Sequence, residues 1–174
     1  MKRFAIAMAL AFLVAVGAFA HGGGGVFSGE QLMIESYSNI GVPLVAHGGY
    51  GYGASHDGIR HGGFGMVLAS DEFDTVAGAF GGIVTGAQRS IGPFMASINL
   101  WSGVGYINPD LLDIPGYAGF MAELTAEAGF APLPWFQVSL YAGMQAFGGF
   151  DLSEFLTQVR YAPVIGSRVT WGSF

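Results

Sequence analysis

The sequence contains no cysteine in its 174 residues. A chain without cysteine has no disulfide framework, no thiolate nucleophile and no thiolate ligand for a metal ion. It also has no attachment point for the lipid of a lipoprotein anchor. The stability of the fold must therefore come from burial, hydrogen bonds and ion pairs.

Positive charge is almost as scarce. Lys2 and Arg3 precede an uncharged apolar stretch over residues 5–18 and a small-residue sequence, A-F-A, that ends at Ala20. This pattern is typical of a secretory signal peptide, which we expect over 1–20. Removing it leaves 154 residues (174 less 20) with no lysine and four arginines against 12 acids. A net charge of about −8 argues against nucleic acid as a partner, because such binding depends on many Lys and Arg contacts.

Long hydrophobic runs are also missing after the signal peptide. No apolar run of eighteen residues follows it, so no transmembrane helix is predicted there. The chain is nevertheless 52% hydrophobic, with 30 glycines and 14% aromatic residues. Because the apolar residues are dispersed in alternation, this composition favours strands with one face in lipid over a water-soluble helical protein.

The clearest alternation is AGFMAELTAEAGFAPLPWFQVSLYAGMQA, over residues 118–146. Every second residue is apolar on both sides of the Pro-Leu-Pro sequence at 132–134. A period of two over more than ten residues predicts a β-strand, and two such segments predict a hairpin with its turn at 131–134. The two strands are about twice the usual length in globular proteins.

The same pattern predicts eight strands in all. They cover residues 31–37, 42–53, 59–69, 75–88, 93–106, 117–130, 135–147 and 156–173. The two longest connections fall at one end of an up-and-down arrangement and the short turns at the other, as in transmembrane barrels. The predicted fold class is therefore all-β, an antiparallel up-and-down transmembrane β-barrel of about eight strands over 31–174. A flexible glycine-rich leader is expected over 21–30.

The chain ends in VTWGSF over residues 169–174. This ending resembles the C-terminal strand of bacterial outer-membrane barrel proteins, in which a terminal aromatic residue serves the assembly machinery as a recognition signal. In size and predicted architecture the mature chain is similar to the small eight-stranded group that includes the OmpX, OmpW and OmpA transmembrane-domain families. The resemblance implies Sec-type export, an integral place in the outer membrane, contact with outer-membrane lipid, and the β-barrel assembly machinery as a partner during insertion.

Alternation assigns two faces to the predicted wall. The side chains expected to face lipid include Phe120, Leu124, Val138 and Leu140. The polar cluster expected in the lumen consists of Glu123, Glu127, Gln137, Tyr141, Gln145, Arg160 and Arg168. The predicted register places Glu123 opposite about Gly143 and Gly143 near Arg160, which predicts an ion pair between Glu123 and Arg160. Eight-stranded interiors are just wide enough for side chains, so we expect a filled lumen whose charges pair with one another.

Aromatic residues near the strand ends are expected to form the girdles that mark both membrane interfaces. They are Tyr50, Tyr52, Phe64, Trp101, Tyr106, Trp135, Phe136 and Trp171. His47 and His61 are expected to face inward on the order of 13 Å apart, too far to share one metal ion. No metal site and no cofactor are predicted.

No catalytic residue is predicted. Ser55, His56 and Asp57 are consecutive, so they cannot align as nucleophile, base and orienting acid, and they indicate a turn instead. The acids Asp71, Glu72, Asp74, Asp110, Asp113, Asp151 and Glu154 fall in the loops expected outside the cell. Two of these loops, 71–74 and 110–113, are candidate contacts for divalent cations.

These observations predict a non-enzymatic outer-membrane barrel with a structural or surface-interaction role. One alternative is a narrow channel for small or hydrophobic molecules. Another is a soluble periplasmic barrel that carries a lipophilic ligand. In that carrier Leu124 and Val138 would line a cavity while Glu123 and Glu127 faced water. Alternation alone does not choose between these orientations.

Overall fold

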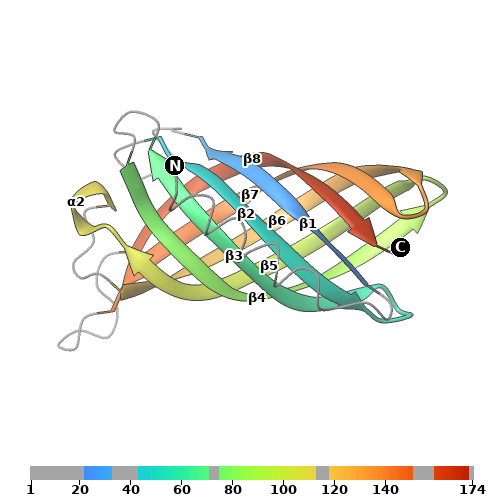
Figure 1. Ribbon diagram of the computed structural model, residues 1–174, viewed down its shortest axis with the longest axis horizontal. Helices are drawn as coiled ribbons and strands as arrows, with labels where there is room; N and C mark the ends of the chain where they lie inside the picture. Colours follow the sequence, from blue (N-terminus) through green and yellow to red (C-terminus); the bar gives the residue numbers. More distant parts are fainter. Residues whose placement is uncertain (1–21, 33–42, 71–74, 113–117, 151–158, 173–174) are drawn as a thin grey trace.

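The computed structural model describes residues 22–32, 43–70, 75–112, 118–150 and 159–172. Eight antiparallel strands form a closed barrel in which consecutive strands pair and β8 pairs with β1 (Figure 1). The strands are β1 (Gly22–Gln31), β2 (Val45–Ala54), β3 (Ile59–Ser70), β4 (Thr75–Ile91), β5 (Phe94–Ile107), β6 (Ala118–Leu133), β7 (Phe136–Gly149) and β8 (Val159–Gly172). The predicted all-β, up-and-down closed barrel is confirmed.

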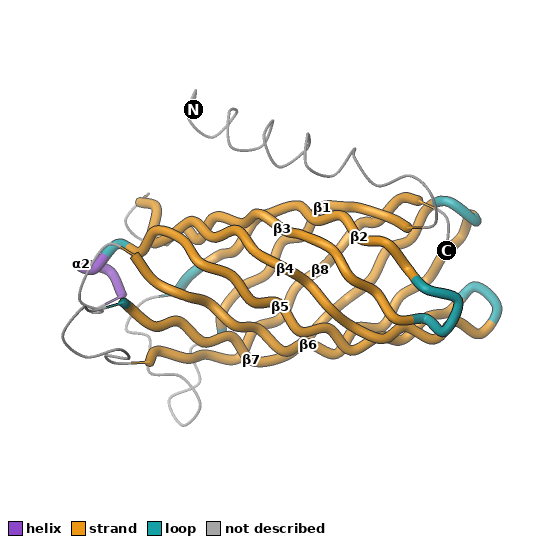
Figure 2. Tube along the Cα trace, turned by 90° about the horizontal axis from the view of Figure 1, so that it is seen from below, coloured by secondary structure: helices purple, strands orange, loops and turns teal. Residues whose placement is uncertain are grey.

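The tilted strands wind around the long axis of the barrel (Figure 2). Short turns at 55–58, 92–93 and 134–135 lie at the end where β8 finishes, which we call the short-turn end. Glycine is required in two of these turns, where Gly58 and Gly92 have φ angles of 81° and 59°. At the opposite, long-loop end the structure describes one short helix, α2 (Pro109–Leu112). No helix of the described residues is long and apolar enough to cross a membrane.

The first strand is a correction. Residues 22–30 belong to β1, so the prediction of a flexible leader there is wrong. Four consecutive glycines show no alternation of polar and apolar side chains, so the sequence gives no sign of a strand there. The backbone of this segment nevertheless pairs with both β2 and β8. A Cβ atom on Gly25 would collide with the backbone of Val169 and Thr170 in β8, so glycine permits the close approach that closes the barrel. The strand predicted over 31–37 lies largely outside the described residues.

Glycines on the two faces of the wall have different steric surroundings. A Cβ atom on Gly48, which faces the lumen, would overlap the Phe27 ring and the carbonyl oxygen of Gly65. A Cβ atom on Gly65 itself, which faces outward, would meet no atom within 4 Å.

We expect Gly48→Ala to lower the free energy of unfolding by about 1–3 kcal/mol, the usual cost of overpacking. Gly65→Ala in the same hairpin should change it by less than about 1 kcal/mol. Urea unfolding of each refolded variant in detergent micelles measures both values. Equal effects at the two positions would contradict the assignment of faces.

Candidate functional site in the barrel lumen

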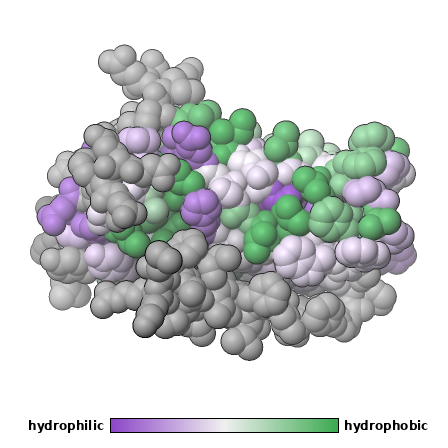
Figure 3. Space-filling model, turned by 45° about the horizontal axis from the view of Figure 1, so that its top comes forward, coloured by the Kyte–Doolittle hydropathy of each residue, from purple (hydrophilic) through white to green (hydrophobic). Residues whose placement is uncertain are grey.

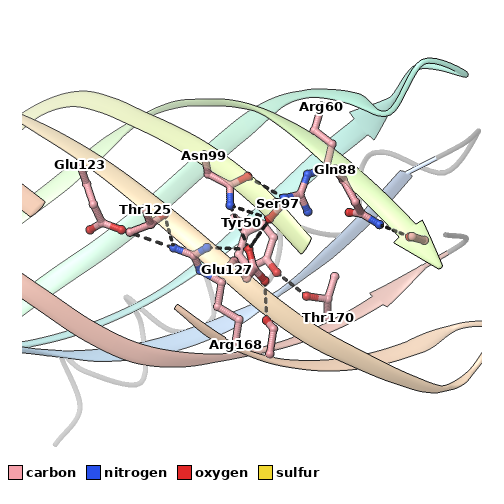
Figure 4. A network of polar contacts seen from close by, with 12 residues as sticks. Tyr50, Arg60, Gln88, Ser97, Asn99, Glu123, Thr125, Glu127, Arg168 and Thr170 are labelled. Carbon is pink, nitrogen blue, oxygen red and sulfur yellow. Dashed lines mark hydrogen bonds and ion pairs between the residues drawn. The ribbon is translucent and has the colours of Figure 1, made fainter. Parts of the chain in front are cut away.

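Arg168 of β8 is the centre of a polar network inside the barrel (Figure 4). Its side chain is buried, with Nη1 2.9 Å from Oε2 of Glu127 and Nη2 3.4 Å from Oε1 of Glu123. The guanidinium carbon lies 3.9 Å from the centroid of the Tyr141 ring and 4.6 Å from that of Trp101. One cation therefore bridges two carboxylates of β6, while aromatic faces fix its position.

Glu127 accepts hydrogen bonds from three other strands and has an ion-pair contact with a fourth. Its Oε2 accepts hydrogen bonds from Asn99 Nδ2 at 2.9 Å and Ser97 Oγ at 3.1 Å, both on β5, in addition to Arg168 on β8. The Ser139 hydroxyl on β7 donates to Oε1, and Arg60 Nη2 on β3 lies 3.8 Å from Oε2. Burial of a carboxylate is costly unless such partners replace its water. Here the hydrogen-bonding side chains around Glu127 take the place of water at its carboxylate.

Glu123 extends the network toward the long-loop end. Its Oε2 accepts a hydrogen bond from Gln145 Nε2 at 2.9 Å, and the Gln145 side-chain oxygen accepts one from Gln31. Gln31 is the last residue of β1, Glu123 lies on β6, and Gln145 lies on β7. The network therefore ties the first strand to the later part of the barrel.

Side chains fill the lumen around and beyond this network. The Trp101 ring centroid lies 5.3–5.4 Å from those of Phe27, Tyr50 and Phe64. Toward the long-loop end the buried residues include a group of apolar side chains: Leu44, Leu68, Phe80, Ile107, Met121 and Phe147. Beside Arg168, a cavity of about 10 Å³ has room for roughly one water molecule.

The remaining predicted members of the lumen cluster lie as follows. Gln137, Tyr141 and Gln145 are buried, with Gln145 fully inaccessible, and Arg160 is half-buried on the inward parity of β8. Pairing with β7 places Arg160 opposite Phe147, toward the long-loop end.

The predicted ion pair between Glu123 and Arg160 is wrong, because Glu123 pairs with Arg168. Gln145 lies opposite Glu123, two residues from the predicted register, and Phe147 lies opposite Arg160. An even shift keeps every side chain on its predicted face and changes only its height along the barrel. For these residues the sequence therefore predicted the face of the wall correctly, but not the ion-pair partner of Glu123.

The histidines and several aromatic residues are further corrections. His61 is exposed on the outer face, where its Nδ1 lies 2.9 Å from the Thr85 hydroxyl, and His47 shares that outward parity. The inward prediction for both is wrong. Four residues expected in the girdles are instead buried in the lumen: Tyr50, Tyr52, Phe64 and Trp101. On β2 and β3 the aromatic side chains lie on the inward face, and the outward positions between them are the glycines Gly49, Gly51, Gly63 and Gly65.

Sequence reasoning missed several residues of the network. Ser97 and Asn99 alternate with apolar residues on β5, which was a usable signal for inward polar positions. Arg60 lies in β3, where glycines interrupt the alternation of polar and apolar side chains, so the sequence does not indicate which face Arg60 is on. The structure shows that it faces Glu127 in the lumen. Of the acids proposed for divalent cations, Asp110 lies in the first turn of α2, and those at 71, 72, 74 and 113 lie outside the described residues. No group of three metal-ligating side chains occurs in the described ranges.

The polar network is close to electrically neutral, with Arg60 and Arg168 against Glu123 and Glu127. Such an arrangement can hold charges in a closed interior and can resist passage of ions through it. Comparison with known proteins adds no assignment: no family model matches the chain, and neither a curated protein nor a solved structure shows significant similarity to it.

Proposed function

We propose that this chain is a non-enzymatic integral outer-membrane β-barrel with a side-chain-filled lumen and a structural or surface-interaction role. One observation carries the proposal: apolar side chains face outward while ion-paired and hydrogen-bonded side chains face inward. Leu124 on β6 and Leu140 on β7 are 56% and 67% exposed, whereas Glu123 and Glu127, on the opposite face of β6, are 4% and 5% exposed. A protein whose surroundings are water has the opposite preference.

The exposed apolar surface is extensive. Besides Leu124 and Leu140 it includes Ile83, Ile98, Leu100, Val104, Val138 and Ile165. Phe120, also expected to face lipid, is half-buried and packs against Phe150, their ring centroids 6.0 Å apart. Figure 3 shows hydrophobic side chains gathered over the barrel wall. A band of this kind fits a hydrocarbon environment.

Outward-facing aromatic residues support two interfaces. Phe94, Phe130 and Trp135 are exposed near the short-turn end, and Tyr106 and Tyr161 are exposed toward the long-loop end. These residues lie on β5 to β8 or in the turn between β6 and β7. Aromatic rings are enriched where the headgroups of a membrane meet its hydrocarbon, so the two groups are suited to its two surfaces.

The alternatives fit the interior less well. A carrier of a lipophilic ligand needs an apolar cavity, whereas this lumen contains buried charges and closely packed aromatic rings. A channel needs a continuous aqueous path, whereas Arg168 and its partners occupy the cross-section beside Trp101. A catalytic role finds little support, because both carboxylates are held by arginine and shielded from solvent.

Cell fractionation tests the proposed location. Expressed with residues 1–20 in a Gram-negative-type host, the protein should sediment with the outer membrane and enter solution only with detergent, because its outward apolar surface needs lipid. A soluble periplasmic protein and an outer-membrane barrel, followed in the same samples, serve as controls. Recovery in the periplasmic fraction without detergent would contradict the proposal.

A further inference from the structure

The three turns at the short-turn end differ in chemistry. The turn at 55–58, between β2 and β3, has the sequence S-H-D-G, and its serine, histidine and aspartate side chains are exposed. The other two turns lie within two segments, 90–109 and 128–150, that contain no charged residue. In Figure 1 the turn between β2 and β3 lies on the opposite side of this end from the turn between β6 and β7. The end of the barrel therefore has a polar side and an uncharged side.

The two uncharged turns, β4 to β5 and β6 to β7, are neighbours in space. The Ala131 amide donates a hydrogen bond of 2.7 Å to the Pro93 carbonyl oxygen, which links the two hairpins. The ring centroids of Phe94 and Phe130 lie 5.4 Å apart beside this link. A groove of about 340 Å³ between the turns is lined mainly by apolar residues of both. The two turns thus form one apolar surface.

Large apolar side chains are exposed on this surface. The exposed fraction is 80% for Ile91, 58% for Trp135 and 44% for Leu133. Phe94 and Phe130 are also exposed and connect the turns to the outward apolar wall of β5 and β6. An exposed apolar patch of this kind marks a contact with a membrane or with another protein.

The backbone of the two turns needs little water. Pro93, Pro132 and Pro134 have no amide N–H, so three donors that would otherwise need partners are absent. The Trp135 carbonyl oxygen accepts a hydrogen bond of 3.0 Å from the Gly172 amide, as the Pro93 carbonyl oxygen does from Ala131. A backbone that enters a membrane must have its polar groups paired within the protein. These turns meet much of that requirement.

We propose that the turns at 92–93 and 134–135 are immersed in the membrane at the boundary between lipid headgroups and acyl chains, while the turn at 55–58 stays in water. Acyl chains fill the groove between the two immersed turns, and this side of the rim anchors the barrel in that leaflet. Lipid is the partner because the surface continues the outward apolar wall, whereas a protein-binding patch is bounded by a polar rim. The inference rests on the proposed function, since it needs a barrel that spans a membrane.

The test exploits the absence of cysteine. Leu133→Cys, Asp57→Cys and Leu124→Cys are each made in the mature protein, labelled with a nitroxide and refolded in phosphatidylcholine vesicles. Electron paramagnetic resonance then compares collisions of the label with oxygen, which concentrates in hydrocarbon, and with a water-soluble nickel chelate. We expect oxygen to dominate at Leu133 and Leu124 and nickel to dominate at Asp57. Calibration with spin-labelled lipids should place the Leu133 label about 5–10 Å inside the phosphate level, the depth of apolar groups at this boundary.

Trp135→Cys, in the same hairpin, takes the place of Leu133→Cys if that variant fails to refold. The inference is overturned if nickel dominates at the hairpin position while oxygen dominates at Leu124, a result that points to a protein partner for the apolar rim. It is also overturned if oxygen dominates at Asp57, because the two sides of the rim then do not differ. Nickel dominating at Leu124 would contradict the proposed function itself.

Discussion

Replacing Arg168 with methionine is expected to lower the free energy of unfolding by about 3–5 kcal/mol, because it leaves buried carboxylates without their main counter-charge. Arg168 is the partner of both Glu123 and Glu127, and its side chain is 1% exposed. Urea unfolding of the refolded protein in detergent micelles measures the loss. Methionine retains most of the volume that packs against Trp101 and Tyr141, so the effect isolates the charge.

A triple variant separates charge from packing. Adding Glu123→Gln and Glu127→Gln to Arg168→Met removes the buried charges together and should restore part of the lost stability, since a neutral set of similar volume avoids the unpaired carboxylates. Arg89→Met, at an exposed position of β4, should change stability by less than about 0.5 kcal/mol. Strictly additive effects of the three lumen substitutions would reject the role given to Arg168.

Leu124→Arg is expected to cost about 2–4 kcal/mol in lipid vesicles, the penalty for arginine facing the middle of a bilayer. Leu124 lies mid-strand on β6, and its cross-strand neighbours Leu100 and Met144 are also exposed and apolar. Unfolding of the vesicle-inserted protein by urea gives the value.

Ile91→Arg is the matched control for that substitution. Ile91 is 80% exposed at the last residue of β4, where a long arginine reaches the interface and the cost should fall to about 0–1 kcal/mol. A barrel surrounded by water would tolerate both substitutions alike, within about 0.5 kcal/mol. Equal small effects would thus argue against insertion.

The fold was predictable because alternation survives in the long strands of the second half. Every outward position of β6 from Ala118 to Phe130 is apolar, and Glu123 and Glu127 mark the inner face. In the first half glycine occupies so many positions that neither period nor face is visible. Backbone pairing determines the strand over Gly22–Gln31 and the outward positions of His47 and His61. The side-chain pattern of the sequence does not report this pairing.

The partners in the lumen were less predictable than its composition. A turn at 134–135 instead of 131–134 changes the register by an even number of residues, which preserves faces but exchanges Arg160 for Arg168 as the partner of Glu123. Long side chains add a further uncertainty, because Arg168 lies opposite Ser139 in the ladder yet reaches Glu123 near the middle of β6. Cross-strand pairing alone therefore does not identify ion pairs in a barrel of this width.

The Arg168 network also has a consequence for assembly. Its contacts join residues far apart in the chain: Tyr50 to Thr170 across 120 positions, Gln31 to Gln145 across 114, and Arg168 to Glu127 across 41. The links between the first strand pair and the last three strands form only when the sheet wraps around on itself, so they belong to the late steps of folding. Until then Glu123 and Glu127 keep their hydration. Dehydration of these two carboxylates is therefore coupled to closure of the sheet into a barrel. In an intermediate whose sheet is not yet closed, the two carboxylates remain hydrated.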